Sequence, residues 1–174
     1  MTYRPICDVW ILARSKVPFY GAYPAGFLHR ARALLGVSLE DPVLHVCAGR
    51  IRDYPYAGLG PNDRTLDIDA KTKPDFLQDA RSSYPIVEPP WAAVLADPPY
   101  TSEDSVNYGD YPLPSANIIL ERAFEAVRKG GRVGLLHYVW PQPPRGRDIR
   151  EVAVIAVGTG RNNRARWFTV WEER

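Results

Sequence analysis

The sequence contains few cysteines and histidines and no long apolar run, and each shortage excludes a class of protein. Its two cysteines, Cys7 and Cys47, fit a reducing compartment and form no metal-binding spacing with the three histidines. We therefore expect no metal, and nothing indicates a disulfide. No stretch approaches the roughly 20 apolar residues of a membrane helix. Arg4, Asp8 and Arg14 interrupt the layout of a signal peptide. These features predict a soluble, cytoplasmic protein without a membrane partner.

The overall charge is nearly balanced, at +2, which neither requires nor excludes a nucleic-acid partner. The length of 174 residues and the hydrophobic content of 45% fit one globular domain with one core. The 17 prolines and 10 tyrosines are high for this length. They indicate long shaped loops, where binding sites tend to lie.

Apolar residues at helical spacing predict helices over residues 27–35 and 115–128. Short continuous apolar runs are typical of buried parallel strands. They predict strands over residues 42–46, 64–68, 91–96 and 132–138. Two last runs, 151–157 and 166–171, flank a polar loop and predict a C-terminal antiparallel hairpin. The chain is therefore expected to be α/β, with a mostly parallel central sheet, helices on both faces and the hairpin at one edge.

Three of the predicted strands end in polar or glycine-containing motifs. These motifs are Cys47-Ala48-Gly49, Asp67-Ile68-Asp69 and Asp97-Pro98-Pro99-Tyr100. Ligands of open α/β sheets bind beyond the carboxyl ends of the strands. We therefore expect all three motifs to gather on one edge of the sheet and form a site there.

The string LADPPY, which ends at Tyr100, resembles the catalytic motif of the S-adenosylmethionine-dependent DNA amino-methyltransferases. These enzymes act on N6 of adenine or N4 of cytosine. The order of the other motifs is similar too: a helix with Tyr23 and Phe27, a glycine loop, an acidic strand end, and then the catalytic loop. The resemblance implies a Rossmann-like methyltransferase fold and S-adenosylmethionine as cofactor. It leaves no room for a separate target-recognition domain, so residues 1–174 are expected to be one methyltransferase domain.

The resemblance implies a catalytic role for each residue of the loop. The carboxylate of Asp97 and the carbonyl of Pro98 would accept the two N–H bonds of an exocyclic amine and direct its lone pair outward. Pro98 and Pro99 would stiffen the loop, because each ring fixes φ. Tyr100 would stack on the base and orient it, and orientation of this kind can lower a barrier by up to roughly 7–11 kcal/mol. The alternative is an ordinary rigid turn after a strand.

The resemblance also implies contacts to the cofactor. Gly49 would let the backbone approach the methionine part, Asp67 or Asp69 would bind the ribose, and Asp79 would bind the adenine amine. Each aspartate could instead cap a turn or lie in solvent, and Tyr23 could be a core residue. The complete expected set is Tyr23, Cys47, Ala48, Gly49, Asp67, Asp69, Asp79, Ala80 and Asp97.

Tyr100, Tyr108, Arg145 and Arg147 are the expected substrate-binding residues, because aromatic rings stack on bases and arginines hold phosphates. Further arginines follow at positions 150, 161, 164 and 166; the alternative for all of them is a merely solvated loop. The resemblance implies N6 of adenine in DNA as the favoured acceptor, because that is usual for the family, and a bacterial or phage source. A homodimer, or a partner subunit that supplies target recognition, is compatible with this interpretation.

Two other interpretations stay open. One is a methyltransferase that acts on RNA or on a protein glutamine, although the similar glutamine enzymes begin their loop with Asn rather than with an acid such as Asp97. The other is a degenerate module that binds S-adenosylmethionine or nucleic acid without reacting. Ile51 supports the second, because it stands where the family has its second loop glycine.

Overall fold

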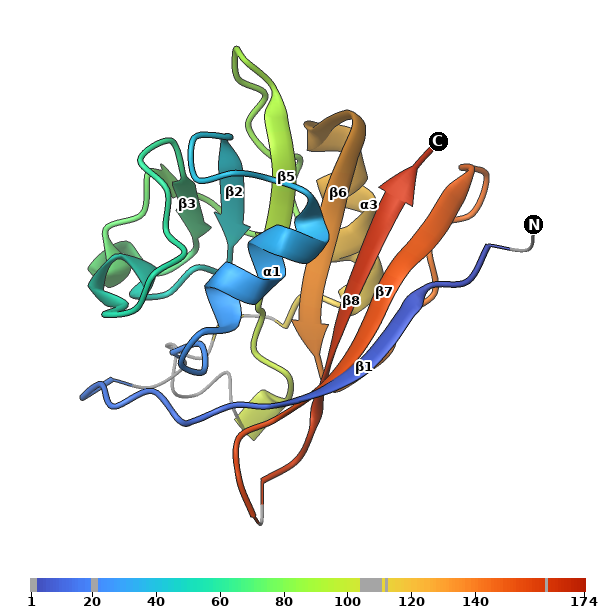
Figure 1. Ribbon diagram of the computed structural model, residues 1–174. Helices are drawn as coiled ribbons and strands as arrows, with labels where there is room; N and C mark the ends of the chain where they lie inside the picture. Colours follow the sequence, from blue (N-terminus) through green and yellow to red (C-terminus); the bar gives the residue numbers. More distant parts are fainter. Residues whose placement is uncertain (1–2, 20–21, 104–110, 112, 162) are drawn as a thin grey trace.

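A computed structural model describes residues 3–19, 22–103, 111, 113–161 and 163–174. In this part of the chain one eight-stranded sheet forms the centre, with helix α1 across one face and helix α3 behind the other (Figure 1). The strand order is β1-β7-β8-β6-β5-β2-β3-β4. The strands are β1 (Ile6–Ile11), β2 (Val43–Val46), β3 (Arg64–Asp67), β4 (Phe76–Leu77), β5 (Trp91–Ala96), β6 (Val127–His137), β7 (Ile149–Gly158) and β8 (Arg166–Glu173). The helices are α1 (Phe27–Leu35) and α3 (Ala116–Ala126), with 3-10 turns η1 (Ile51–Asp53) and η2 (Ala70–Thr72). The expected α/β class, mostly parallel sheet and antiparallel hairpin are confirmed.

Each face of the sheet has its own hydrophobic core. On the α1 face, Phe27 packs edge-on against Phe168 of β8, with ring centres 5.0 Å apart. On the α3 face, Ile119 and Phe124 are buried with Trp91 of β5. The inner strands β2 and β5 are buried along their whole length, which explains why their sequences are continuous apolar runs.

The expected place of the C-terminal hairpin at the edge of the sheet is wrong. β8 is inserted between β6 and β7 and is antiparallel to both. The edge belongs to β1, which pairs with β7 in parallel and was not predicted. An edge strand needs little burial, and in β1 only Trp10 is buried. Its sequence, ICDVWI, is nevertheless a short apolar run that only Asp8 interrupts.

Helix boundaries follow local signals in the sequence. Gly36 ends α1 in a left-handed conformation, with φ at 68°, as glycine allows. Ser115 caps α3, because its side chain accepts the N–H of Ile118. The second predicted helix ends two residues early, at Ala126, because β6 begins at Val127 and takes in the following glycines. No helix of the described residues is long and apolar enough to cross a membrane.

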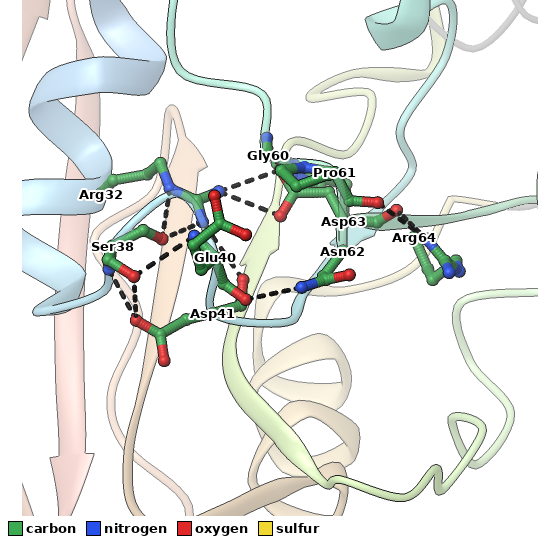
Figure 2. Close-up of polar contacts among 10 residues, drawn as sticks. Arg32, Ser38, Glu40, Asp41, Gly60, Pro61, Asn62, Asp63 and Arg64 are labelled. Carbon is green, nitrogen blue, oxygen red and sulfur yellow. Dashed lines mark hydrogen bonds and ion pairs between the residues drawn. The ribbon is translucent and has the colours of Figure 1, made fainter.

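A buried ion pair fixes α1 to the loops that precede β2 and β3 (Figure 2). Arg32 Nη1 lies 2.9 Å from Asp63 Oδ2, and both side chains are almost fully buried. Asp63 Oδ2 also accepts the N–H of Gly60 and lies 3.0 Å from His45 Nε2. The guanidinium of Arg32 donates in addition to the carbonyl of Ser38. The network thus connects α1 to both loops through buried polar contacts.

Candidate functional site

The three predicted motifs lie together at the carboxyl ends of the parallel strands, as expected. These ends point toward the bottom of Figure 1, where the loops after β2, β3 and β5 gather. The backbone N–H of Gly49 donates to Asp67 Oδ2 over 2.7 Å, which joins the first two motifs. Cys47, Asp67 and Pro99 border one cavity, which brings in the third. Parallel pairing is the reason: it places the ends of these strands side by side.

The larger of two neighbouring cavities opens directly over the Asp97-Pro98-Pro99-Tyr100 loop. Its volume of about 360 Å³ suits a small-molecule or base-sized ligand. Three arginines stand around it, and Asp97 is the carboxylate in its wall. The residues that line it are Arg14, Ser15, Val17, Phe19, Ala22, Pro24, Asp97, Pro98, Pro99, Tyr100, Tyr138, Thr159, Asn163, Arg164 and Arg166.

One oxygen of Asp97 is held by a hydrogen bond from Tyr100, which in turn accepts one from Arg166. The hydroxyl of Tyr100 donates to Asp97 Oδ1, and Arg166 Nη1 donates to that same hydroxyl over 3.2 Å. The ring of Tyr100 packs on Tyr138, with ring centres 4.5 Å apart, and edge-on to His137. Tyr100 thus lies beside the carboxylate with its ring among aromatic side chains of β6 and the residue after it.

Burial raises the pKa of Asp97 to about 6, because a carboxylate loses hydration energy in this setting. The charge of Arg166 and the hydrogen bond from Tyr100 oppose this rise. An acid whose pKa is displaced this far, inside a cavity, is typical of functional sites.

A second cavity of about 50 Å³ lies on the other side of the same loop. Leu66, Asp67 and Ile68 of the β3 end form one wall, and Gln78, Asp79 and Ala80 form another. Pro99 lines both this cavity and the larger one. The Asp97-Pro98-Pro99-Tyr100 loop therefore lies between the two cavities.

The acidic residues near the second cavity take different structural roles. Asp67 is half-buried, and its two oxygens accept the backbone N–H groups of Gly49 and Asp69. Burial raises the pKa of Asp67, although these bonds lower it. Asp69 instead caps η2 by accepting the N–H of Lys71. Asp79 is paired with Arg81 at the rim of the cavity.

The loop after β2 leaves room above its glycine. Gly49 has φ at 53°, and a Cβ placed on it meets no atom within 4 Å. Cys47 adopts φ at 54°, which is a strained conformation for a side chain other than glycine. Ile51 begins η1 and is buried in the core of the α1 face. The residue that stands in place of the second glycine is therefore a buried core side chain, which also borders the small hollow beside Ala48.

Tyr23 carries a buried hydroxyl for which the described residues provide no hydrogen-bond partner. Its ring stacks on Phe27, with centres 4.9 Å apart, and it borders a small hollow together with Ala48 and Ile51. Burial and the nearby Asp97 raise the pKa of Tyr23 well above its usual value, so the hydroxyl stays neutral. Buried hydroxyl groups in proteins usually have a hydrogen-bond partner, so this hydroxyl is a candidate for a bond to a ligand atom. This hydroxyl, the space over Gly49 and the Asp67 cavity are the places at which the residues present could contact an adenosyl-amino-acid cofactor.

Two expected substrate residues are not brought to this site. Arg147 pairs with Glu173 at the start of β7, and Arg145 is exposed in the same segment. β7 runs parallel to β6. After β6 ends beside the cavity, the chain must therefore return to the amino-terminal ends of the parallel strands before β7 begins. Neither arginine lines the cavity over Asp97. Tyr108, the third expected contact, lies outside the described residues.

Other residues line the cavity that sequence reasoning did not assign to it. Arg14 follows β1 and reaches Asn163 of the β7–β8 loop with a hydrogen bond. Phe19 comes from the same segment, and Tyr138 directly follows β6. Arg14 could have been found only if β1 had been recognised. Tyr138 stood at the end of a predicted strand, which was the available signal.

No protein-family model matches the sequence, and no curated protein does. Solved structures do resemble the fold. TrmN from Thermus thermophilus is 22% identical, with a TM-score of 0.57 over 89% of this chain and 50% of its own. An rRNA methylase from Streptococcus thermophilus is 13% identical, with a TM-score of 0.52 over 87% and 99%. SMU.1697c from Streptococcus mutans, crystallised with S-adenosylhomocysteine (SAH), is 12% identical, with a TM-score of 0.52 over 83% and 95%. The chain spans half the length of TrmN, and the likeness establishes the Rossmann-like methyltransferase fold.

Proposed function

We propose that the protein transfers a methyl group from S-adenosylmethionine to an exocyclic amine of a nucleobase. The observation that carries the proposal is the position of Pro99, whose loop separates two cavities. One is bordered by the residues expected to hold adenosine, and the other exposes Asp97. A transferase needs this layout, because donor and acceptor must meet across a short distance.

The residues of the smaller spaces would hold the cofactor. Asp67 would accept the ribose hydroxyls, because each carboxylate oxygen can accept a second hydrogen bond beside those from Gly49 and Asp69. Ala80 and Asp79 would border the adenine, and the hydroxyl of Tyr23 would reach the methionine part. S-adenosylmethionine, when bound, supplies a methyl group that a nitrogen lone pair can attack.

Asp97 and Pro98 would prepare the acceptor. The lone pair of a base amine is delocalised into the ring, so the amine is a weak nucleophile. Accepting its two N–H bonds at the carboxylate of Asp97 and the carbonyl of Pro98 favours a more tetrahedral nitrogen. Ionisation keeps both oxygens of Asp97 as acceptors, one for Tyr100 and one for the amine, and with a pKa of about 6 the carboxyl is mostly ionised at neutral pH. No covalent intermediate is required.

The nucleic-acid class of the acceptor has two candidates. The Asp-Pro-Pro-Tyr motif favours N6 of adenine in DNA, in which the base must be flipped out of the duplex. A neighbour in fold described as an rRNA methylase favours a base in RNA. Arg14 and Arg164, at the rim of the cavity, suit the phosphates of either polymer.

The test is transfer of labelled methyl from S-adenosylmethionine to duplex DNA, single-stranded DNA and RNA in parallel, followed by nucleoside analysis. Label in N6-methyladenine from one polymer supports the proposal and identifies the acceptor. Label in N4-methylcytosine keeps the mechanism and changes the base. Cofactor binding with no label in any polymer contradicts the proposal in favour of a protein or small-molecule acceptor. Absence of cofactor binding favours a non-catalytic module.

A further inference from the structure

Arg166 comes to the site from β8, far from the catalytic loop in sequence. It is the first residue of the strand and pairs with Val157 of β7. Side chains alternate between the faces of a strand, so Arg166 shares a face with Phe168 and Val170. Both of these are fully buried in the core of the α1 face. The start of β8 therefore places Arg166 at the end of the sheet where Asp97 lies.

A chain of two hydrogen bonds connects this cation to the carboxylate. Arg166 Nη1 donates to the hydroxyl of Tyr100, and that hydroxyl donates to Asp97 Oδ1. The guanidinium carbon of Arg166 also lies 6.0 Å from the centre of the Tyr100 ring. Tyr100 is thus held between the two charged groups.

Near neutral pH the tyrosine, cysteine and histidine side chains around Asp97 carry no charge. Burial raises the pKa of the Tyr23 hydroxyl, the Cys47 thiol and the Tyr100 hydroxyl, and it lowers the pKa of His137, which packs on Tyr100. Arg14 and Arg164 line the same cavity but are engaged elsewhere, by Asn163 and by the ring of Tyr138. Among the described residues, Arg166 is the cation whose charge acts on the pKa of Asp97.

We propose that Arg166 is a positioning residue that keeps Asp97 ionised and holds Tyr100 against it. This inference rests on the proposed function, in which Asp97 must accept N–H bonds from the substrate amine. A protonated carboxyl would present an O–H donor in place of one acceptor. Burial pushes Asp97 toward this inactive form, and the nearby positive charge opposes it.

Carboxyl-carbon NMR titration tests the proposal without any substrate. The protein is labelled with 13C-aspartate, and the Asp97 signal is assigned by its loss in Asp97→Asn. In Arg166→Gln we expect the Asp97 titration to move up by at least about 1 pH unit, and in Arg166→Lys to stay near that of the wild type. Lys129→Gln, an exposed site at the start of β6, is the matched control and should leave the titration unchanged. An unchanged Asp97 titration in a folded Arg166→Gln protein overturns the proposal.

The pH profile of single-turnover methyl transfer provides the second measurement. In Arg166→Gln the rate should fall roughly two- to tenfold at pH 7 and recover toward that of the wild type near pH 9. A loss of equal size at every pH indicates a merely structural role and overturns the proposal. If the wild type transfers no methyl to any polymer, the proposed function fails, and the NMR titration still decides whether Arg166 controls Asp97.

Discussion

At the scale of single residues, Asp97 combines two properties that oppose each other. Its place at the end of a buried strand exposes it to the cavity, and the same place removes much of its hydration. An ordinary turn aspartate would lie in solvent with its usual pKa. The sequence predicted the position of this carboxylate, but its pKa depends on Arg166 and Tyr100, whose approach is set by tertiary packing.

We predict that Asp97→Asn stabilises the fold while it strongly slows methyl transfer. The pKa of Asp97 is raised in the folded state to about 6, so the folded protein binds more protons than the unfolded chain between roughly pH 4 and 6. Stability is therefore lost as the pH rises through this window, and Asn avoids the loss. Urea unfolding at pH 7 should show a gain of up to about 3 kcal/mol, which disappears near pH 4.

The matched control is Glu125→Gln on α3, which removes a partly exposed acid paired with Arg122. It should leave stability nearly unchanged. A less stable Asp97→Asn protein at pH 7 would show that the ionised carboxylate is not under electrostatic stress.

A second prediction concerns Gly49. Gly49→Ala places a methyl group in the open space where the cofactor is expected and forces a left-handed residue other than glycine, which costs about 1–2 kcal/mol. We expect the affinity for S-adenosylmethionine to fall roughly tenfold or more, measured by calorimetry. Gly130→Ala is the matched control, because Gly130 has φ at 71° and equally open surroundings. It should lose similar stability and keep cofactor affinity; equal affinity in both variants would remove Gly49 from the site.

At the scale of elements, the inner part of the fold was predictable and the edge was not. The strand over residues 91–96 and the helix over residues 27–35 were predicted with their observed bounds, because both have strong apolar patterns and clear end signals. β1 was missed although its sequence, ICDVWI, is a short apolar run that only Asp8 interrupts. Its absence from the prediction also hid Arg14, and it left the hairpin at the wrong place. Arg147 was predicted at the site for a similar reason. It precedes β7, and the direction of β7 depends on its pairing with β8, which the local sequence does not show.

The buried network around Asp63 yields a prediction at this scale. Asp63→Asn leaves the buried charge of Arg32 without compensation and should reduce stability by about 3–5 kcal/mol in urea unfolding. Burial raises the pKa of Asp63, but the bonds from His45, Gly60 and Arg32 bring it below its usual value. The stabilisation is therefore present at neutral pH and lost as the pH falls through that lowered pKa.

Asp53→Asn, which breaks an exposed pair with Arg50, is the control and should change stability little. Since α1 lies directly after Tyr23 in the chain, Asp63→Asn should also weaken cofactor binding. Equal stability of the two variants would mean that the network does not hold α1.

At the scale of the whole molecule, a nearly neutral protein concentrates positive charge at one edge. Arg14, Arg164 and Arg166 stand around the cavity although the net charge is only +2. If the first two hold phosphates, Arg14→Gln and Arg164→Gln should each reduce the slope of log affinity against log salt by about 1 for the preferred polymer. Arg128→Gln, at the opposite edge where β6 begins, should leave the slope unchanged. Identical slopes in all three variants would place the nucleic acid elsewhere.

The central claim is that Asp97 activates an acceptor amine for methyl transfer. Its most direct test is single-turnover transfer by the wild type and by Asp97→Asn, with saturating S-adenosylmethionine and the polymer that accepts label. We predict that Asp97→Asn binds the cofactor with nearly unchanged affinity and transfers methyl at least about a hundredfold more slowly. A variant that transfers methyl at the rate of the wild type would contradict it.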